Sequence, residues 1–530
     1  MATVETNPPP AQVAGAPHPQ THKGLIIFAV MLTTALSALD ANIVGTAIPS
    51  IVGALRGIGL LPWLVTAFML TSTVSVPLYG KLADLYGRKP VLLAGVTLFL
   101  AGSALCGVAG SMEQLIAFRA LQGLGAGSVV PVTLTLIGDL FEMEERARLQ
   151  GLFSAVWGVS SVLGPLVGGF IVTVWSWPWV FLVNVPVGLL AMGILAVYLR
   201  EPVRNRAKRP SLDLVGAATL TGGLTAALTA LSLVSNGAGW GSTEVVALLG
   251  LALALLVAFV VVERRAAEPL IPLDLLTAPI TRVSIAAGIF SSGLVFGGGA
   301  YLPILVQGVW QGSPLEAGLA LAPLSIGWPL ASTVAGRAIL RWGYRPVALV
   351  GAVLIAVGGL LLLPLGPGGP IWLLPVAMFV QGLGCGFNFT TMLMAVQNAA
   401  SWERRGAATS LYQFSRNIGG VIAVAVLGYA LSTALAGALA QIPTLPGVPT
   451  AAAGGSQLGP ASVLLDLNAR THLAPATLAT LEAALADGLR PVLWVAAFLG
   501  LGTGLATWFF PAERIPTRAA PAEEPALPGA

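Results

Sequence analysis

The sequence predicts an all-α polytopic membrane protein made of two related helical bundles, and composition and an internal repeat are the main reasons. Hydrophobic residues make up 56% of the 530 residues and charged residues only 9%, and the mean hydropathy is +0.86. Soluble globular domains carry about 25% charged residues. Apolar stretches of about 20 residues, long enough to cross the hydrocarbon core as helices, recur along the whole chain.

Fourteen of these apolar stretches are expected to be transmembrane helices. They lie approximately at residues 24–48, 62–80, 91–110, 113–137, 150–174, 179–199, 212–234, 243–262, 282–306, 315–336, 346–365, 370–395, 407–432 and 490–510.

The basic residues indicate the orientation of these helices. If the N-terminus is cytoplasmic, 21 of the 26 Lys and Arg residues fall in cytoplasmic loops and tails. Cytoplasmic loops of membrane proteins are enriched in Lys and Arg, so both termini are expected in the cytoplasm. The basic pI of about 9.3 is then explained by topology and by contacts with anionic lipids, without a nucleic-acid partner.

An internal repeat predicts how the helices are grouped. QGLGAG at 122–127 returns as QGLGCG at 381–386, and GKLADLYGRKP at 80–90 returns as GRAILRWGYRP at 336–346. The separations, 259 residues (122 to 381) and 256 residues (80 to 336), carry the second helix onto the tenth and the fourth onto the twelfth. Helices 1–6 and 9–14 are therefore predicted to form two related six-helix bundles, with two further helices inserted between them. Transporters that work by alternating access commonly hold their substrate between two such repeats.

This grouping divides the chain into bundles, inserted helices, tails and one loop. The expected parts are a disordered cytoplasmic tail (1–23), an N-terminal six-helix bundle (24–200), two inserted helices (212–262), a C-terminal six-helix bundle (282–510) and a cytoplasmic tail (511–530). The C-terminal bundle contains a long external loop (433–489), within which a short helix is expected around 474–486.

Five motifs in the first half of the chain carry a family resemblance. They are LDANIVGTAIP (39–49); Gly80, Asp84, Gly87, Arg88 and Lys89 between the second and third helices; the segment 115–127 with Arg119 and Gln122; GVSSVLGPLVGG (158–169); and WSWPWVFLVNVPVG (175–188). In this order they resemble the major facilitator superfamily, and within it the fourteen-helix drug:proton antiporters of the EmrB/QacA type. The resemblance implies the major facilitator fold and a proton-coupled antiporter for multidrug efflux in a bacterial-type inner membrane.

Asp40 and Arg119 are the candidate proton-coupling residues. Each lies inside an apolar segment, where a charged side chain costs about 2.5–3.5 kcal/mol even on insertion scales, and such residues are functional candidates by default. Asp40 is the candidate proton carrier, and Arg119 is expected to pair with it. The alternatives are that Asp40 is a packing residue bonded to Ser or Thr, and that Arg119 reaches the outer interface or binds backbone carbonyls.

Two glycine-containing segments are candidate gating elements. In the fifth helix they are Gly158, Gly164, Pro165, Gly168 and Gly169. Small residues four apart share one helix face and allow a close helix contact, and plain packing is the alternative to a gate. In the 80–89 loop, Asp84 and Arg88 are spaced to pair with each other or with a neighbouring helix end. The alternative there is that Arg88 and Lys89 only set topology.

The substrate-cavity candidates come from helices that the resemblance places near the cavity. They are Asn42, Gln122, Trp157, Phe290, Phe296, Tyr301, Trp328, Phe387, Asn388, Tyr412, Gln413 and Arg416. Arg416 has two open interpretations, a substrate contact or an anchor for the cytoplasmic end of its helix. An apolar cavity with Asp40 as its main charge would suit lipophilic compounds, including cations.

Other classes of function fit the sequence less well. The only Gly-Lys pair, Gly80-Lys81, lacks the Walker pattern of an ATP-driven pump. All three histidines lie in the tail or the external loop, so neither a metal site nor an intramembrane enzyme is expected. No cofactor is expected, since the proton gradient supplies the energy, and a monomer in the lipid bilayer is expected. A lipid or metabolite exporter on the same scaffold is the alternative, followed by a non-transporting receptor or scaffold.

Overall fold

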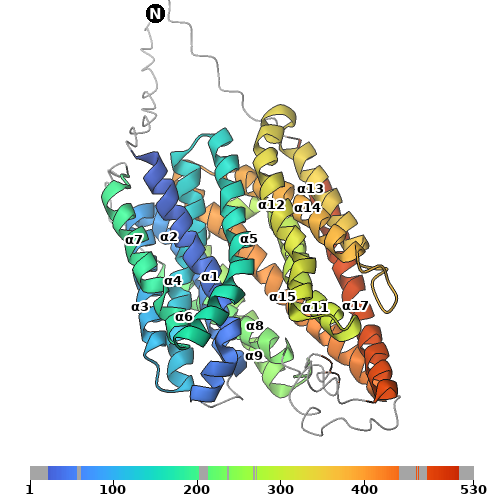
Figure 1. Ribbon diagram of the computed structural model, residues 1–530. Coiled ribbons are helices and arrows are strands. Elements are labelled where there is room, and N and C mark those ends of the chain that lie inside the picture. The colour runs from blue at the N-terminus through green and yellow to red at the C-terminus, as the bar shows by residue number, and fades with distance from the viewer. Residues whose placement is uncertain are drawn as a thin grey trace, which may run out of the picture.

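The computed structural model describes residues 22–55, 61–201, 213–235, 238–266, 273–440 and 474–512, with a few single positions between them. Within these residues all regular structure is helical (Figure 1). The expected tail 1–23, apart from its last two residues, the basic cluster at 204–209, most of the tail 511–530 and nearly all of 441–473 lie outside the described residues.

The first bundle holds seven helical segments that correspond to the six expected spans. They are α1 (Lys23–Leu55), α2 (Leu61–Tyr86), α3 (Arg88–Gly107), α4 (Met112–Leu140), α5 (Met143–Val174), α6 (Trp179–Leu182) and α7 (Asn184–Tyr198). The sixth expected span is interrupted at Val183. Pro186 lacks the N–H that would bond to the carbonyl of Leu182, which explains the break.

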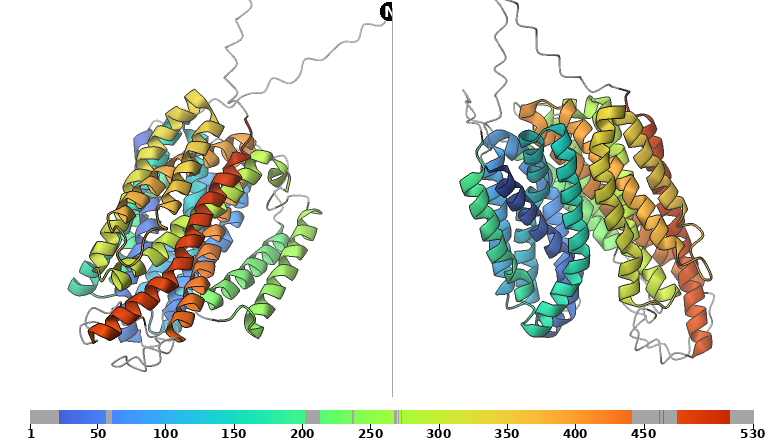
Figure 2. Two further views of the ribbon diagram at one scale, coloured as in Figure 1. Left: turned by 90° about the vertical axis from the view of Figure 1, so that its right-hand side faces the viewer. Right: turned by 45° about the horizontal axis from the view of Figure 1, so that its top comes forward.

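The second bundle follows after an inserted pair of helices. The pair is α8 (Leu214–Ser235) and α9 (Thr243–Glu263), and the short α10 (Leu273–Thr277) leads into α11 (Pro279–Ile304), η2 (Leu305–Val309), α12 (Pro314–Trp342), α13 (Tyr344–Leu360), α14 (Leu373–Ala399), η3 (Trp402–Arg404), α15 (Arg405–Ala440) and α17 (Pro475–Trp508). The two bundles stand side by side (Figure 1). The α8–α9 pair projects to one side in Figure 2, where α8 packs on α2 of the first bundle and on α15 of the second.

Twelve helices in the described part of the chain are long and apolar enough to cross a membrane, so the chain is a multi-pass membrane protein. The helices α5 and α13 are not among the twelve. Both nevertheless pack within their bundles, α5 against α1 and α13 against α14. The expected count of fourteen spans is thus not confirmed and stays a prediction.

At the end of the second bundle the helix expected around 474–486 is present, but it is continuous with the expected 490–510 helix. The helix α15 continues to Ala440, and α17 already begins at Pro475. Glu482, Asp487 and Arg490 lower the hydropathy of this first part of α17, so it does not read as a membrane span. Its alanines favour a helix, and its buried leucines recur every four residues at Leu481, Leu485 and Leu489.

The repeated glycine motif forms the same packing contacts in both bundles. A Cβ atom added to Gly125 of α4 would lie 2.7 Å from the Gly95 carbonyl oxygen of α3, and one added to Gly384 of α14 would lie 2.8 Å from the Gly351 carbonyl oxygen of α13. In the same way Gly123 faces α2 at Phe68, and Gly382 faces α12. Only glycine allows backbones to approach this closely, so the repeat preserves helix packing.

Candidate functional site

Asp40 of α1 and Arg119 of α4 form a buried ion pair. The distance from Arg119 Nη1 to Asp40 Oδ2 is 2.6 Å, and the residues are 0% and 2% exposed. The predicted pairing is therefore confirmed, and Arg119 does not reach the outer interface. Two opposite charges taken out of water need close geometry and further hydrogen bonds to offset the loss of hydration.

Polar side chains from three other elements complete the coordination of Asp40. Gln122 Nε2 of α4 and Asn184 Nδ2 of α7 donate to Asp40 Oδ1 at 2.8 and 3.1 Å. Gln122 Oε1 accepts from Arg119 Nη1 at 2.7 Å. Ser103 Oγ of α3 accepts from both amides, at 3.1 and 3.0 Å, and donates to the Phe181 carbonyl. Asp40 is thus bonded to α4 and α7 and linked to α3 through Ser103.

This network corrects one prediction and adds two residues. Gln122 was expected in the substrate cavity, but it is fully buried between Asp40 and Arg119. Asn184 and Ser103 were not predicted. Asn184 lies within the 175–188 motif, where an amide in an otherwise apolar helix is the signal that would have indicated it.

Aromatic rings cover the Arg119 guanidinium. Its Cζ lies 4.0 Å from the ring centre of Phe68 and 5.7 Å from that of Phe181. Cation–π contacts of this kind strengthen when the cation is removed from water. Binding a proton at Asp40 would remove the negative charge that Arg119 faces, so this arrangement can convert proton binding into a change of pairing.

At the end of α2 the first bundle is bonded to the start of α15. Asp84 accepts from the backbone amides of Gly406 and Ala407 at 2.9 and 2.6 Å, where the helix dipole favours a carboxylate. Arg88 Nη2 lies 3.1 Å from Asp84 Oδ1. Both expected kinds of contact, with Arg88 and with a neighbouring helix end, are therefore present.

Asp139 at the end of α4 extends this connection. Its carboxylate lies 2.8 Å from Arg88 Nε and 2.9 Å from Arg405 Nη1 of α15. Arg88 also donates to the Trp402 carbonyl at 3.1 Å. Asp139 and Arg405 were not predicted, because the paired residues lie more than 250 positions apart in the sequence. We call Asp84, Arg88, Asp139 and Arg405 the inter-bundle cluster.

The other residues of the 80–89 motif support the cluster. Gly80 lets α2 approach Ser410 of α15, closer than any side chain would permit. Gly87 has a φ of 100°, a conformation that favours glycine. Lys89 Nζ donates to the carbonyls of Ala196 and Leu199 at the end of α7, at 2.6 and 2.7 Å. Lys89 therefore caps a helix in addition to any effect on topology.

The helix-5 glycines contact both bundles. A Cβ on Gly164 would lie 2.6 Å from Asn42 Cβ of α1, and one on Gly168 would lie 2.8 Å from the Ile43 carbonyl oxygen. A Cβ on Gly158 would lie 2.9 Å from the Ser325 carbonyl oxygen of α12. Gly169 has no such neighbour within 4 Å, so it takes no part in this close contact, and its role in gating stays a prediction. The Pro165 side chain lies outside the described residues.

Gly164→Leu is expected to lower transport about tenfold or more and to lower the Tm, because the added side chain overlaps Asn42 and overpacking costs about 1–3 kcal/mol. Gly169→Leu is the matched control, since the same side chain meets open space there. Initial uptake into everted vesicles, proton leak and the melting temperature of purified protein measure the effect. Unchanged transport and leak in Gly164→Leu would remove the gating interpretation.

The expected cavity residues fall into two groups by exposure. Trp157, Phe290 and Phe296 are 36%, 37% and 43% exposed. Tyr301 is instead buried in the second-bundle core, where its hydroxyl donates to the Val424 carbonyl at 2.9 Å, so its expected place in the cavity is wrong. Asn42 donates to the Ala38 carbonyl at 2.7 Å beside Gly164, which makes it part of the α1–α5 contact.

Several remaining candidates gather around Arg416 in the second bundle. Arg416 lies over the rings of Phe389 and Trp328 and bonds Gln413. Tyr412 is buried beside Arg416, and both face Gly288 of α11. Asn388, which is buried, and Phe387, which is half-buried, lie instead against Gly351 of α13.

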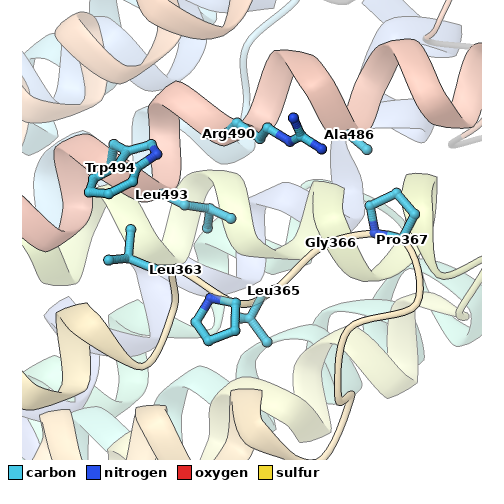
Figure 3. A pocket seen from close by; sticks show the side chains of 9 residues that line it. Leu363, Leu365, Gly366, Pro367, Ala486, Arg490, Leu493 and Trp494 are labelled. Carbon is cyan, nitrogen blue, oxygen red and sulfur yellow. The ribbon is translucent and has the colours of Figure 1, made fainter.

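A separate cavity of about 380 Å³ lies between α17 and the α13–α14 connection (Figure 3). Its walls include Leu363, Pro367, Leu493 and Trp494, with Arg490 at its edge. None of the expected cavity residues lines it. The described residues hold no cluster of three or more side chains suited to a metal ion, and Cys106 and Cys385 are buried free thiols.

Comparisons with known proteins agree with this fold. The Multidrug transporter protein MdtP of Bacillus subtilis (strain 168) is 38% identical over 409 residues, covering 77% of this chain and 75% of that protein. Multidrug resistance protein 3 of the same organism is 35% identical, covering 77% and 80%. The crystal structure of the human organic anion transporter MFSD10 superposes with a TM-score of 0.59 over 93% of this chain and all of that chain. At 16% identity this last likeness shows the fold alone.

The family model described as Major Facilitator Superfamily matches residues 30–424 and 285–510, which together span both bundles. The chain is therefore a membrane transporter that belongs to the Major Facilitator Superfamily.

Proposed function

We propose that the protein is a proton-coupled antiporter that exports lipophilic or amphipathic small molecules, and so acts in multidrug efflux at the cytoplasmic membrane with both termini inside. The Asp40–Arg119 pair carries this proposal, because a membrane protein keeps a buried acid and a buried base at this cost chiefly where they serve ion movement or substrate binding. The names of the two Bacillus relatives support drug efflux.

The proposed coupling runs from Asp40 to the bundle interface through packed helices. Protonation of Asp40 frees Arg119 from its ion pair and changes the fit of α1 against α4. The helix α1 is packed tightly on Gly164 and Gly168 of α5, and α5 contacts α12 through Gly158. A shift of α1 therefore bears on the interface between the bundles. The inter-bundle cluster holds one face closed until that shift occurs.

Everted membrane vesicles test this function directly, because export then appears as uptake. With an acidic interior, vesicles carrying the protein are expected to accumulate lipophilic dyes, and collapse of the pH gradient with nigericin is expected to stop uptake. Vesicles without the protein are the control. Uptake that ignores the gradient would contradict proton coupling. Movement of labelled phospholipid without any dye uptake would instead indicate a lipid exporter.

A further inference from the structure

Arg416 is an intramembrane cation with no acidic partner among the described residues. It lies about 16 Å along α15 from Arg405, which is near the middle of a membrane span. Arg416 contacts residues of α11, α14 and α15, and Trp328 of α12. No acidic residue occurs in α11, α14 or α15. Arg119 stands in contrast, since Asp40 neutralises it. A guanidinium in the membrane needs a negative or strongly polar partner.

The contacts of Arg416 orient it and leave donors free. Nε donates to Ser292 Oγ at 3.3 Å and Nη1 donates to Gln413 Oε1 at 3.1 Å. A guanidinium carries five N–H donors, so three of them, including both on Nη2, have no hydrogen-bond partner among the described residues. Its Cζ lies 3.7 Å from the ring centre of Phe389 and 5.7 Å from that of Trp328. The aromatic rings cover the flat face of the guanidinium, whereas its N–H groups point outward in the plane of the group. A ligand can therefore accept hydrogen bonds from these N–H groups at the edge of the guanidinium.

Neighbouring buried polar groups also lack partners within the described part of the chain. They are the Tyr412 hydroxyl and the indole N–H of Trp328. A Cβ on Gly288 of α11 would lie 3.1 Å from the Tyr412 ring and 3.2 Å from Arg416 Cγ. The Tyr412 and Arg416 side chains therefore lie next to each other against α11. Unsatisfied buried polar groups are rare, and a ligand or water is their usual explanation.

We infer that Arg416 is the binding group for the negative charge of the substrate, and that the preferred substrates are amphipathic carboxylates with a flat apolar body. The substrate carboxylate accepts hydrogen bonds from the remaining N–H groups of Arg416. The apolar body of the substrate contacts the rings of Trp328 and Phe389. This inference rests on the proposed export function and replaces the expectation of cationic compounds, because Asp40 is buried and already paired.

Binding of three pyrene probes to the purified full-length protein tests the charge preference without a variant. The probes are pyrenebutyrate, its methyl ester and a trimethylammonium analogue of the same length, followed by fluorescence anisotropy. Pyrenebutyrate is expected to bind about 10- to 100-fold more tightly than the ester. This is the gain in affinity that a hydrogen bond to a charged group typically provides. Equal affinity for acid and ester, or tighter binding of the ammonium probe, would overturn the inference.

Arg416→Gln assigns that preference to the residue. It is expected to remove the preference for the acid over the ester and to leave the affinity for the ester unchanged, whereas Arg416→Lys retains part of the preference. Retention of the ester affinity also shows that the variant is folded. A preference for the acid that persists in Arg416→Gln would contradict the inference.

Two further arms separate the inference from its alternatives. An anionic lipid is another source of the charge, so displacement of pyrenebutyrate by phosphatidylglycerol would assign the site to a lipid phosphate and overturn the substrate assignment. Arg416-dependent binding of pyrenebutyrate without uptake in vesicles would support the site and contradict export. Dye uptake without any preference for the acid over the ester would support export and contradict the Arg416 site.

Discussion

Asp40→Asn is expected to abolish gradient-driven uptake into everted vesicles, with initial rates reduced about 100-fold or more. Asparagine has nearly the shape of aspartate and can still bond Gln122 and Asn184, but it cannot carry a proton or neutralise Arg119. A 100-fold loss corresponds to about 2.7 kcal/mol. Substrate exchange across vesicles without a pH gradient is expected to persist, because exchange requires no net proton movement.

The control for this variant is Asp487→Asn, which removes the same charge from a pair with Arg490 whose side chains are 58% and 71% exposed. Exposed pairs contribute about 0–1 kcal/mol, so uptake should stay near that of the unchanged protein. Full gradient-driven uptake in Asp40→Asn would show that Asp40 is a packing residue, as the alternative interpretation holds.

Asp139→Ala is expected to open the interface between the bundles at the inter-bundle cluster. The change leaves Arg88 without its Asp139 contact and Arg405 without its ion-pair partner, and breaking a buried pair costs about 3–5 kcal/mol. A cysteine at Ser410, which is buried against Gly80, reports the opening. Labelling by an impermeant maleimide in everted vesicles is expected to rise about tenfold or more, in a chain whose two native cysteines are serine.

Asp274→Ala is the matched change, since it removes a surface pair with Arg404 whose side chains are 52% and 62% exposed. Its labelling rate should equal that of the parent chain. Equal labelling in Asp139→Ala and Asp274→Ala would mean that the cluster does not hold this face closed.

The bundles could be predicted from the sequence because membrane helices obey local rules. Each span must satisfy its own backbone hydrogen bonds within about 20 apolar residues, so hydropathy alone placed most helices. The repeat could also be predicted from the sequence. Gly123 of α4 packs against the backbone of α2, and Gly382 of α14 packs against the backbone of the equivalent helix α12. Hydropathy failed where a helix is amphipathic, as in the first turns of α17 around Leu481 and Leu485.

The candidate site was predictable only in part, because its partners come from distant parts of the sequence. Asp40 and Arg119 could be paired because each was a costly charge without a neighbour. Ser103, Asn184 and Asp139 were missed, since nothing local marks a polar residue as the partner of another helix. The Asp40–Arg119 ion pair, and the lack of an acidic partner for Arg416 among the described residues, become known only from the structure.

The central claim is that Asp40 carries the protons whose movement drives the substrate in the opposite direction. Purified protein in liposomes with an internal pH-sensitive dye tests it most directly, with substrate added outside and no imposed gradient. Entry of substrate is expected to drive protons out and raise the internal pH, and Asp40→Asn is expected to show no pH change. Substrate entry at constant pH in the unchanged protein, or an equal pH change in Asp40→Asn, would contradict the account.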